Sequence, residues 1–198
     1  MDFDKVIEKR KSVRDFTGKV VSWKDILYAV DTAIKGPAAG GDLPLTFLIV
    51  EHAENIDKVA EQCEQDWIKN ASIVVLVVSD DKHLENQYGD RGRVYCRQQA
   101  GAAINTMLLK LVDLGLGACW VGSYSDAKLR RVFDIPSNKQ IEAVIPVGYE
   151  STSLKGTRGL RRKKRLVGSL NWEKWGKRRR EPVFLERMSK ADIHGHPL

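Results

Sequence analysis

Apolar residues recur along the chain with two periods, one typical of helices and the other typical of strands. Helical spacing predicts helices at the start of the chain and over about 22–34, 54–68, 94–114 and 125–133. Apolar runs predict strands over 45–50, 72–78, 118–122 and 141–149. The run over 72–78 has no polar interruption, which indicates burial on both of its faces. This order of elements indicates an α+β or α/β protein in which helices flank a central mixed sheet.

Residues at the ends of two predicted helices support these assignments. Ser22 begins a Ser-Trp-Lys-Asp sequence that has the form of a capping box, with Asp in place of Glu. Gly115 follows the long helix, where a left-handed glycine commonly ends a helix. Trp120 lies within a predicted strand, and we expect it to be a core residue.

Two stretches outside these elements differ in composition. Residues 36–44 are mostly small and are predicted to form an ordered loop. From Glu150 onward the chain becomes polar and basic, and only 170–175 carries an apolar anchor. We therefore expect one domain over 1–176 and a polar tail or arm over 177–198.

The composition excludes several classes of protein. The 198 residues are 42% hydrophobic, which is enough for one globular core. No apolar run approaches the roughly 20 residues that a membrane helix needs. The first residues are acidic and mixed, unlike a signal peptide, so we expect a cytoplasmic protein. The three cysteines are odd in number and widely spaced, and we expect neither disulfides nor a metal site.

The net charge of +7 is concentrated in three basic clusters, which lie at 9–14, 158–165 and 177–180. Such clusters suggest nucleic-acid binding. However, no helix-turn-helix or RNA-binding signature accompanies them, and aromatic residues are not interleaved with them. A small ligand that carries a phosphate explains the first two clusters equally well, so binding to nucleic acid is the weaker interpretation.

Two segments are candidates for ligand binding. Arg10, Lys11, Ser12 and Arg14 can surround a phosphate with cations and a hydroxyl donor, although they also suit a solvated helix end. The loop over 36–44 can present backbone N–H groups to a flat ligand, although an ordinary turn has the same composition. No catalytic triad and no paired carboxylates are evident. An enzyme whose cofactor performs the chemistry fits this pattern, and we assign no catalytic side chain.

Taken together, these segments resemble the nitroreductase family in their order and spacing. Residues 9–16 resemble its Arg-x-Ser-x-Arg-x-Phe opening, and 36–41 are similar to its Pro-Ser-Ala-x-Asn loop. Residues 115–122 match its Gly-Leu-Gly-x-x-Trp-x-Gly segment, and 145–149 match its Pro-x-Gly-Tyr strand. Residues 161–166 and 171–176 resemble its C-terminus, so the likeness covers roughly 3–176.

The resemblance implies an α+β fold with a central mixed sheet flanked by helices, and an interlocked homodimer with FMN at the subunit interface. The residues that would bind the FMN phosphate are Arg10, Lys11, Ser12 and Arg14, together with Arg161 and Lys163 from the late basic cluster. The partner subunit's loop would place Pro37, Ala38, Ala39 and Gly40 near the flavin. Val121 and Gly122 would lie along the ring.

The implied activity is hydride transfer from NADH or NADPH to the flavin and then to an electron-poor small molecule, such as a nitroaromatic or a quinone. The sequence departs from the family pattern at Gly41, where Asn is frequent, and at Leu43, where Gln is frequent. It also carries Gln98-Gln99 where an acidic residue is common, and Arg165 in place of Pro. These departures leave open a flavin-binding protein, or a specialised flavin-site enzyme on the same fold, without general nitroreductase turnover.

Overall fold

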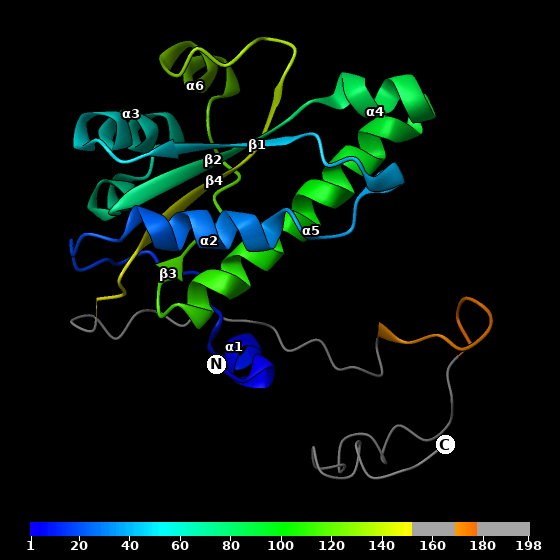
Figure 1. The fold of residues 1–198 in the computed structure, drawn as a ribbon, viewed down its shortest axis with the longest axis horizontal. Coiled ribbons are helices and arrows are strands. Elements are labelled where there is room, and N and C mark those ends of the chain that lie inside the picture. Colours follow the sequence, from blue (N-terminus) through cyan, green and yellow to red (C-terminus); the bar gives the residue numbers. More distant parts are fainter. Residues whose placement is uncertain (152–168, 178–198) are drawn as a thin grey trace. The chain divides into compact units, whose positions relative to one another are not determined.

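The computed structural model describes residues 1–151 and 169–177. The chain divides into two units, Met1–Gly156 and Thr157–Leu198, and each is described by itself. The first unit contains a four-stranded sheet with helices on both faces (Figure 1). The α+β fold class is thereby confirmed. None of the helices in the two described ranges is long and apolar enough to cross a membrane.

The sheet has the strand order β1-β2-β4-β3, and its named strands pair antiparallel. The strands are β1 (Leu45–Val50), β2 (Ile73–Ser79), β3 (Gly117–Ala118) and β4 (Gln140–Gly148). The central strands β2 and β4 are buried almost throughout, as the unbroken apolar run of β2 predicts. A parallel bridge joins Ser12 to Ala118 at the β3 edge.

The two faces of the sheet support two separate cores, because successive side chains of a strand point to opposite faces. Ile73, Val75 and Val77 face a core shared with α2 (Trp23–Ala33) and α5 (Arg91–Asp113). Val74 and Leu76 face the other core, together with α3 (Ala53–Cys63), the short turn η2 (Asp66–Asn70) and α6 (Asp126–Val132). The remaining helices are α1 (Phe3–Lys9), α4 (Asp81–Tyr88) and the single turn η1 (Ala39–Gly41).

The predicted helix ends at Ser22 and Gly115 are confirmed. The Ser22 hydroxyl accepts a hydrogen bond from the Lys24 N–H at 3.3 Å and so caps α2. At the end of α5, Gly115 has a φ of 79°, and the N–H groups of Gly115 and Leu116 donate to the carbonyls of Val112 and Leu111. This pair of bonds is a Schellman motif, which directs the chain from α5 straight into β3.

The structure differs from the expected elements in three places. The third helix ends at Cys63 because Glu64 adopts a left-handed φ of 53°, and η2 follows as a separate turn. The predicted strand over 118–122 is reduced to Gly117–Ala118, with one further bridge between Val121 and Val144. Helix α4 was not expected, since its sequence is polar and only Leu84 is buried.

The second unit is described over residues 169–177. The Trp172 N–H donates to the Lys177 carbonyl at 2.8 Å, and the Gly176 N–H donates to the Asn171 side chain at 3.0 Å. These bonds close a tight loop that leaves Trp175 almost fully exposed. The division into a domain over 1–176 and a tail over 177–198 stays a prediction.

Candidate functional site

The basic segment at the start of the chain lies beside β3. Ser12 forms the parallel bridge with Ala118, and the Val13 N–H donates to the Ala118 carbonyl at 3.0 Å. The same extended segment reaches the end of β4, where the Thr17 N–H donates to the Tyr149 carbonyl at 2.9 Å. Val13 is buried, whereas Ser12 and Arg14 on either side of it are exposed, as alternation along an extended chain requires.

Two glycines allow this close approach. A Cβ atom at Gly117 would lie 2.9 Å from both methyl groups of Val13. A Cβ atom at Gly148 would lie 2.7 Å from the Phe16 ring. Glycine at these positions therefore brings the basic segment into direct contact with the sheet.

Three of the predicted phosphate-binding side chains act on a common point, the thiol of Cys119. Burial raises the pKa of this thiol, while the positive charges of Arg14 and Arg10 and a hydrogen bond from Ser12 act in the opposite direction. Arg10, Ser12 and Arg14 thus gather around the segment that follows β3. The guanidinium of Arg14 also lies 6.0 Å from the centre of the Trp67 ring.

Lys11 is placed differently. Its ammonium forms a 2.6 Å ion pair with Glu150, and both side chains are exposed. The structure therefore brings together Arg10, Ser12 and Arg14, and it pairs Lys11 with Glu150 just after β4.

The chain after β3 alternates between a buried and an exposed residue at the two positions predicted to lie along the ring. Val121 is buried, and its backbone exchanges hydrogen bonds with Val144 at 2.9 and 3.1 Å. Gly122 is exposed, and a Cβ atom at this position would meet no atom within 4 Å. Of the two predicted ring contacts, Gly122 is the one with free space beside it.

The prediction that Trp120 is a core residue is wrong, because its side chain is 42% exposed. Its neighbours Cys119 and Val121 point into the core, so the alternation of an extended chain directs Trp120 outward. The ring lies beside α5, where a Cβ atom at Gly101 would approach it to 3.9 Å.

The small-residue loop lies against α4 and α5 rather than near the basic segment. The N–H of Ala39 donates to the side chain of Gln99, and Gln99 donates to the Asp42 carbonyl at 3.3 Å. Gly40 has a φ of 62°, and a Cβ atom there would lie 2.5 Å from the Tyr88 hydroxyl. Figure 1 shows the loop beside α4 and the start of α5, while β3 follows the other end of α5.

The loop and the Trp120 segment lie on opposite sides of α5. Gln99 contacts the loop and Gly101 is nearest to Trp120, and residues two positions apart on a helix differ in direction by about 200°. Within one protomer, Pro37, Ala38, Ala39 and Gly40 are therefore not brought together with the basic segment. The two other predicted phosphate ligands, Arg161 and Lys163, lie outside the described residues.

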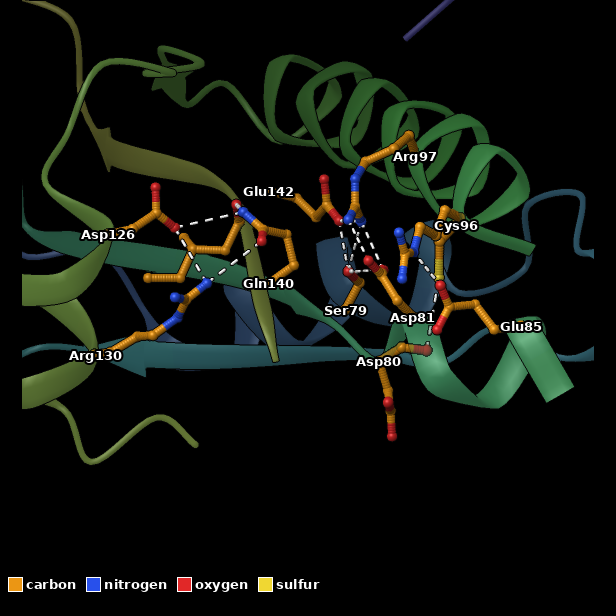
Figure 2. Close-up of polar contacts among 12 residues, drawn as sticks. Ser79, Asp80, Asp81, Glu85, Cys96, Arg97, Asp126, Arg130, Gln140 and Glu142 are labelled. Carbon is orange, nitrogen blue, oxygen red and sulfur yellow. Dashed lines mark hydrogen bonds and ion pairs between the residues drawn. The ribbon is translucent and has the colours of Figure 1, made fainter. Parts of the chain in front are cut away.

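A polar network that sequence reasoning missed joins the sheet to α4 and α5 (Figure 2). The guanidinium of Arg97 donates to Ser79 at 3.0 Å and to Asp81 at 2.8 Å, and it also pairs with Glu142. Burial raises the pKa of Glu142, and the hydrogen bond from Ser79 and the charge of Arg97 oppose this shift. Because its members satisfy one another, this network serves to fix the start of α5 on the sheet.

A pocket of about 540 Å³ lies at the β1 edge of the first unit. Its walls include Leu45 and Thr46 of β1, Asp80 after β2, and the stretch from Phe133 to Pro136. It touches the small-residue loop at Asp42–Pro44 and contains none of the predicted cofactor-binding residues. We therefore do not assign the cofactor to it.

Comparison with known proteins gives concordant results. The model of the nitroreductase family matches residues 51–149, which is half of the chain. A protein of Methanothermobacter thermautotrophicus, named as a candidate NADH dehydrogenase/NAD(P)H nitroreductase, is 31% identical over 164 residues, which cover 81% of this chain and 83% of that protein.

Solved structures share the fold. A nitroreductase family protein of Clostridium difficile 630 superposes with a TM-score of 0.76 at 22% identity, covering 88% of this chain and 99% of that one. A protein of Clostridium difficile R20291, named an FMN-dependent nitroreductase, gives a TM-score of 0.65 at 20% identity over 76% of this chain and 88% of its own. The sequence matches and the shared fold together show that the chain belongs to the nitroreductase family.

Proposed function

We propose that this chain binds FMN and works, as a homodimer, as an FMN-dependent NAD(P)H oxidoreductase. The observation that carries the proposal is the position of the basic segment along β3, where Ser12 bridges Ala118 and the Val13 N–H donates to the Ala118 carbonyl. Arg10, Ser12 and Arg14 of this segment act on the thiol of Cys119, three residues before Gly122. The names of the relatives support it, since one is an NAD(P)H nitroreductase by name and another an FMN-dependent nitroreductase. A cytoplasmic location stays a prediction.

The chemistry of these side chains fits the phosphate of FMN. A guanidinium presents N–H donors in a planar fork that matches phosphate oxygens, and Ser12 adds a hydroxyl donor. In our proposal Arg10, Ser12 and Arg14 hold the phosphate. Lys11 is paired with Glu150 in the free protomer and would add its charge to the phosphate site only on leaving that pair. Arg161 and Lys163 are candidates for phosphate binding as well.

The backbone beyond β3 fits the flat ring. Gly122 has no side chain, and a Cβ atom there would meet no atom within 4 Å apart from its chain neighbours, so a planar ligand could approach the main chain closely. The antiparallel bridge to Val144 holds Val121, and with it the neighbouring Gly122, on the sheet. Bound FMN would supply acceptance of a hydride from NADH or NADPH and its delivery to an electron-poor acceptor.

A second copy of the chain completes the proposed site. The loop residues Pro37 to Gly40 lie on the opposite side of α5 from Trp120 in their own protomer, so they would contact the FMN of the partner. Exposed apolar residues support dimer formation: Trp23 and Leu27 of α2 and its C-cap residue Ile34 recur at helical spacing and are all about half exposed, and they are called the apolar stripe on α2. Several exposed large apolar side chains on one helix face are typical of an interface.

The first test is the visible absorbance spectrum of the purified protein, followed by anaerobic addition of NADH or NADPH. We expect a yellow protein whose flavin absorbance is bleached by one of the two donors. A yellow protein that neither donor bleaches would favour the alternative that Gly41 and Leu43 suggest, a flavin-binding protein without general turnover. A colourless protein that does not bind added FMN would refute the proposal.

The placement of the phosphate is tested by the double variant Arg10→Ala with Arg14→Ala. Each charge-assisted hydrogen bond contributes about 1.5–3 kcal/mol, so the loss of two should weaken FMN binding by at least about 100-fold. The matched control is Lys5→Ala with Lys58→Ala, which removes the same charge from exposed positions of α1 and α3. FMN titration of both variants measures the difference, and equal affinities would contradict our placement.

A further inference from the structure

We propose that Gln99 is a positioning residue that fixes the loop 38–42 in the conformation in which one protomer offers it to the FMN of its partner. This inference rests on the proposed function, because the loop matters to FMN only if a second copy is present. It assigns a role to a residue of α5 that is not itself placed in contact with the cofactor.

The burial of Gln99 is the first observation. Among the described residues, Gln99 and Ser79 are the two buried polar residues, and Gln99 is 6% exposed. A buried amide destabilises the fold unless its donor and acceptor both find partners. The hydrogen-bond partners of Gln99 therefore indicate its role.

Both ends of the Gln99 amide are bonded to the backbone of the loop. Its Oε1 accepts from the Ala39 N–H, and its Nε2 donates to the Asp42 carbonyl at 3.3 Å. The loop supports this arrangement with its own tight bonds, from the Gly41 N–H to Ala38 at 3.3 Å and from the Asp42 N–H to Ala39 at 3.1 Å. One side chain thus spans the whole turn from entry to exit.

Helix α4 holds the same loop from another side. The Asp42 carboxylate accepts a hydrogen bond from Gln87 at 3.0 Å and lies 3.1 Å from the Nε2 atom of His83. Tyr88 lies against Gly40, which keeps a left-handed φ of 62° that other residues rarely adopt. Together these contacts fix the side chain of Asp42 and the turn at Gly40. Gln99 fixes the backbone on either side of that turn, at Ala39 and Asp42.

The outer surface of the loop stays available. Pro37 and Gly40 are exposed, whereas the groups that Gln99 binds point inward. Because the loop is already ordered within the free protomer, FMN binding does not bear the entropic cost of ordering it. Loss of the Gln99 bonds would remove the partners of the part-buried Ala39 N–H and Asp42 carbonyl and release the turn.

The test uses Gln99→Leu, with Gln98→Leu as the matched control, since Gln98 is the exposed neighbour on the same helix. For Gln99→Leu we expect FMN binding weaker by roughly 10- to 100-fold and an altered flavin absorbance band, because a small misplacement of a binding group has effects of this order. In the protein without FMN, amide hydrogen exchange of Ala39 should accelerate in Gln99→Leu only.

A second variant separates positioning from general damage to the fold. In Gln99→Glu the ionised carboxylate can accept from Ala39 but cannot donate to Asp42, whereas the protonated acid can do both. Burial favours the protonated form, so lowering the pH should restore FMN affinity toward that of the wild type measured at the same pH. Gln98→Glu should show no such recovery.

The outcomes distinguish this inference from the proposed function. If the wild type binds no FMN, the proposed function fails whatever Gln99 does. If the wild type binds FMN, and Gln99→Leu and Gln99→Glu match it in affinity and spectrum at every pH, the inference on Gln99 is overturned. Faster exchange at Ala39 with unchanged FMN affinity would overturn it as well.

Discussion

At the scale of single residues, the three cysteines show how burial governs chemistry. Cys63, Cys96 and Cys119 are all buried and unpaired. Burial raises the pKa of Cys63 to about 11 and that of Cys96 to about 12, and it raises the pKa of Cys119 against the opposing arginines. The thiolate is the reactive form of cysteine, and these shifts keep it scarce near neutral pH.

We therefore expect iodoacetamide at pH 8 to leave all three thiols of the native protein unmodified and to alkylate all three in urea. Mass spectrometry of the intact protein measures the number of labels. Because two arginines and Ser12 oppose the rise in the pKa of Cys119, it should react first if the pH is raised. Rapid labelling of the native protein at pH 8 would show that the surroundings of Cys119 are more open than described.

The same scale shows where sequence reasoning reaches its limit. The motif that contains Arg10, Ser12 and Arg14 could be found from residue types alone, because phosphate binding has a chemical signature. The role of Gln99 could not, since its partners are backbone atoms of a loop some sixty residues earlier in the chain. The outward direction of Trp120 was within reach, because alternation with Cys119 and Val121 predicts it.

At the scale of elements, the apolar pattern predicted the strands β1, β2 and β4 more accurately than it predicted helices of polar sequence. Strand β1 occupies the predicted residues 45–50, and β2 and β4 begin and end within one residue of expectation. Burial on both faces explains this success for β2 and β4, because such strands require continuous apolar sequence, whereas β1 is a partly buried edge strand. Helix α4 escaped prediction because it buries only Leu84 and is held instead by its contacts with α5 and the loop.

The contact between the basic segment and β3 could not be predicted, because more than a hundred residues separate them. It depends on the absence of a side chain at Gly117, and this dependence can be measured. Gly117→Ala places a methyl group against Val13, and overpacking of this kind destabilises a protein by about 1–3 kcal/mol. Gly122→Ala adds the same methyl group where no protein atom lies within 4 Å.

We expect the free energy of unfolding in urea, measured without FMN, to fall in Gly117→Ala. In Gly122→Ala it should stay within about 0.5 kcal/mol of the wild-type value. FMN binding should nonetheless weaken in Gly122→Ala, because the methyl group would occupy space proposed for the flavin ring. If FMN affinity is unchanged in Gly122→Ala, the ring does not lie at this glycine.

At the scale of the whole molecule, the long helix α5 organises the first unit. Its middle packs on the sheet, its start is fixed by the Arg97 network, and its end leads through Gly115 into β3. The exposed apolar stripe on α2 lies on the helix that packs beside α5. The end of α5 at Gly115 was predicted from the sequence, whereas its packing on the sheet and its contacts through Arg97 require the full set of helix and strand packings.

The separation of the loop from the basic segment by the body of α5 has a genetic consequence. If each FMN is held by the arginines of one copy and the loop of the other, a copy with Arg10→Ala and Arg14→Ala and a copy with Gln99→Leu damage different halves of each site. Co-expressed, they would form mixed pairs in which one pocket carries both lesions and the other carries neither. Such mixed pairs should retain one tightly bound FMN per two chains, although each parent alone retains little; mixed pairs no better than their parents would mean that each copy builds its pocket alone.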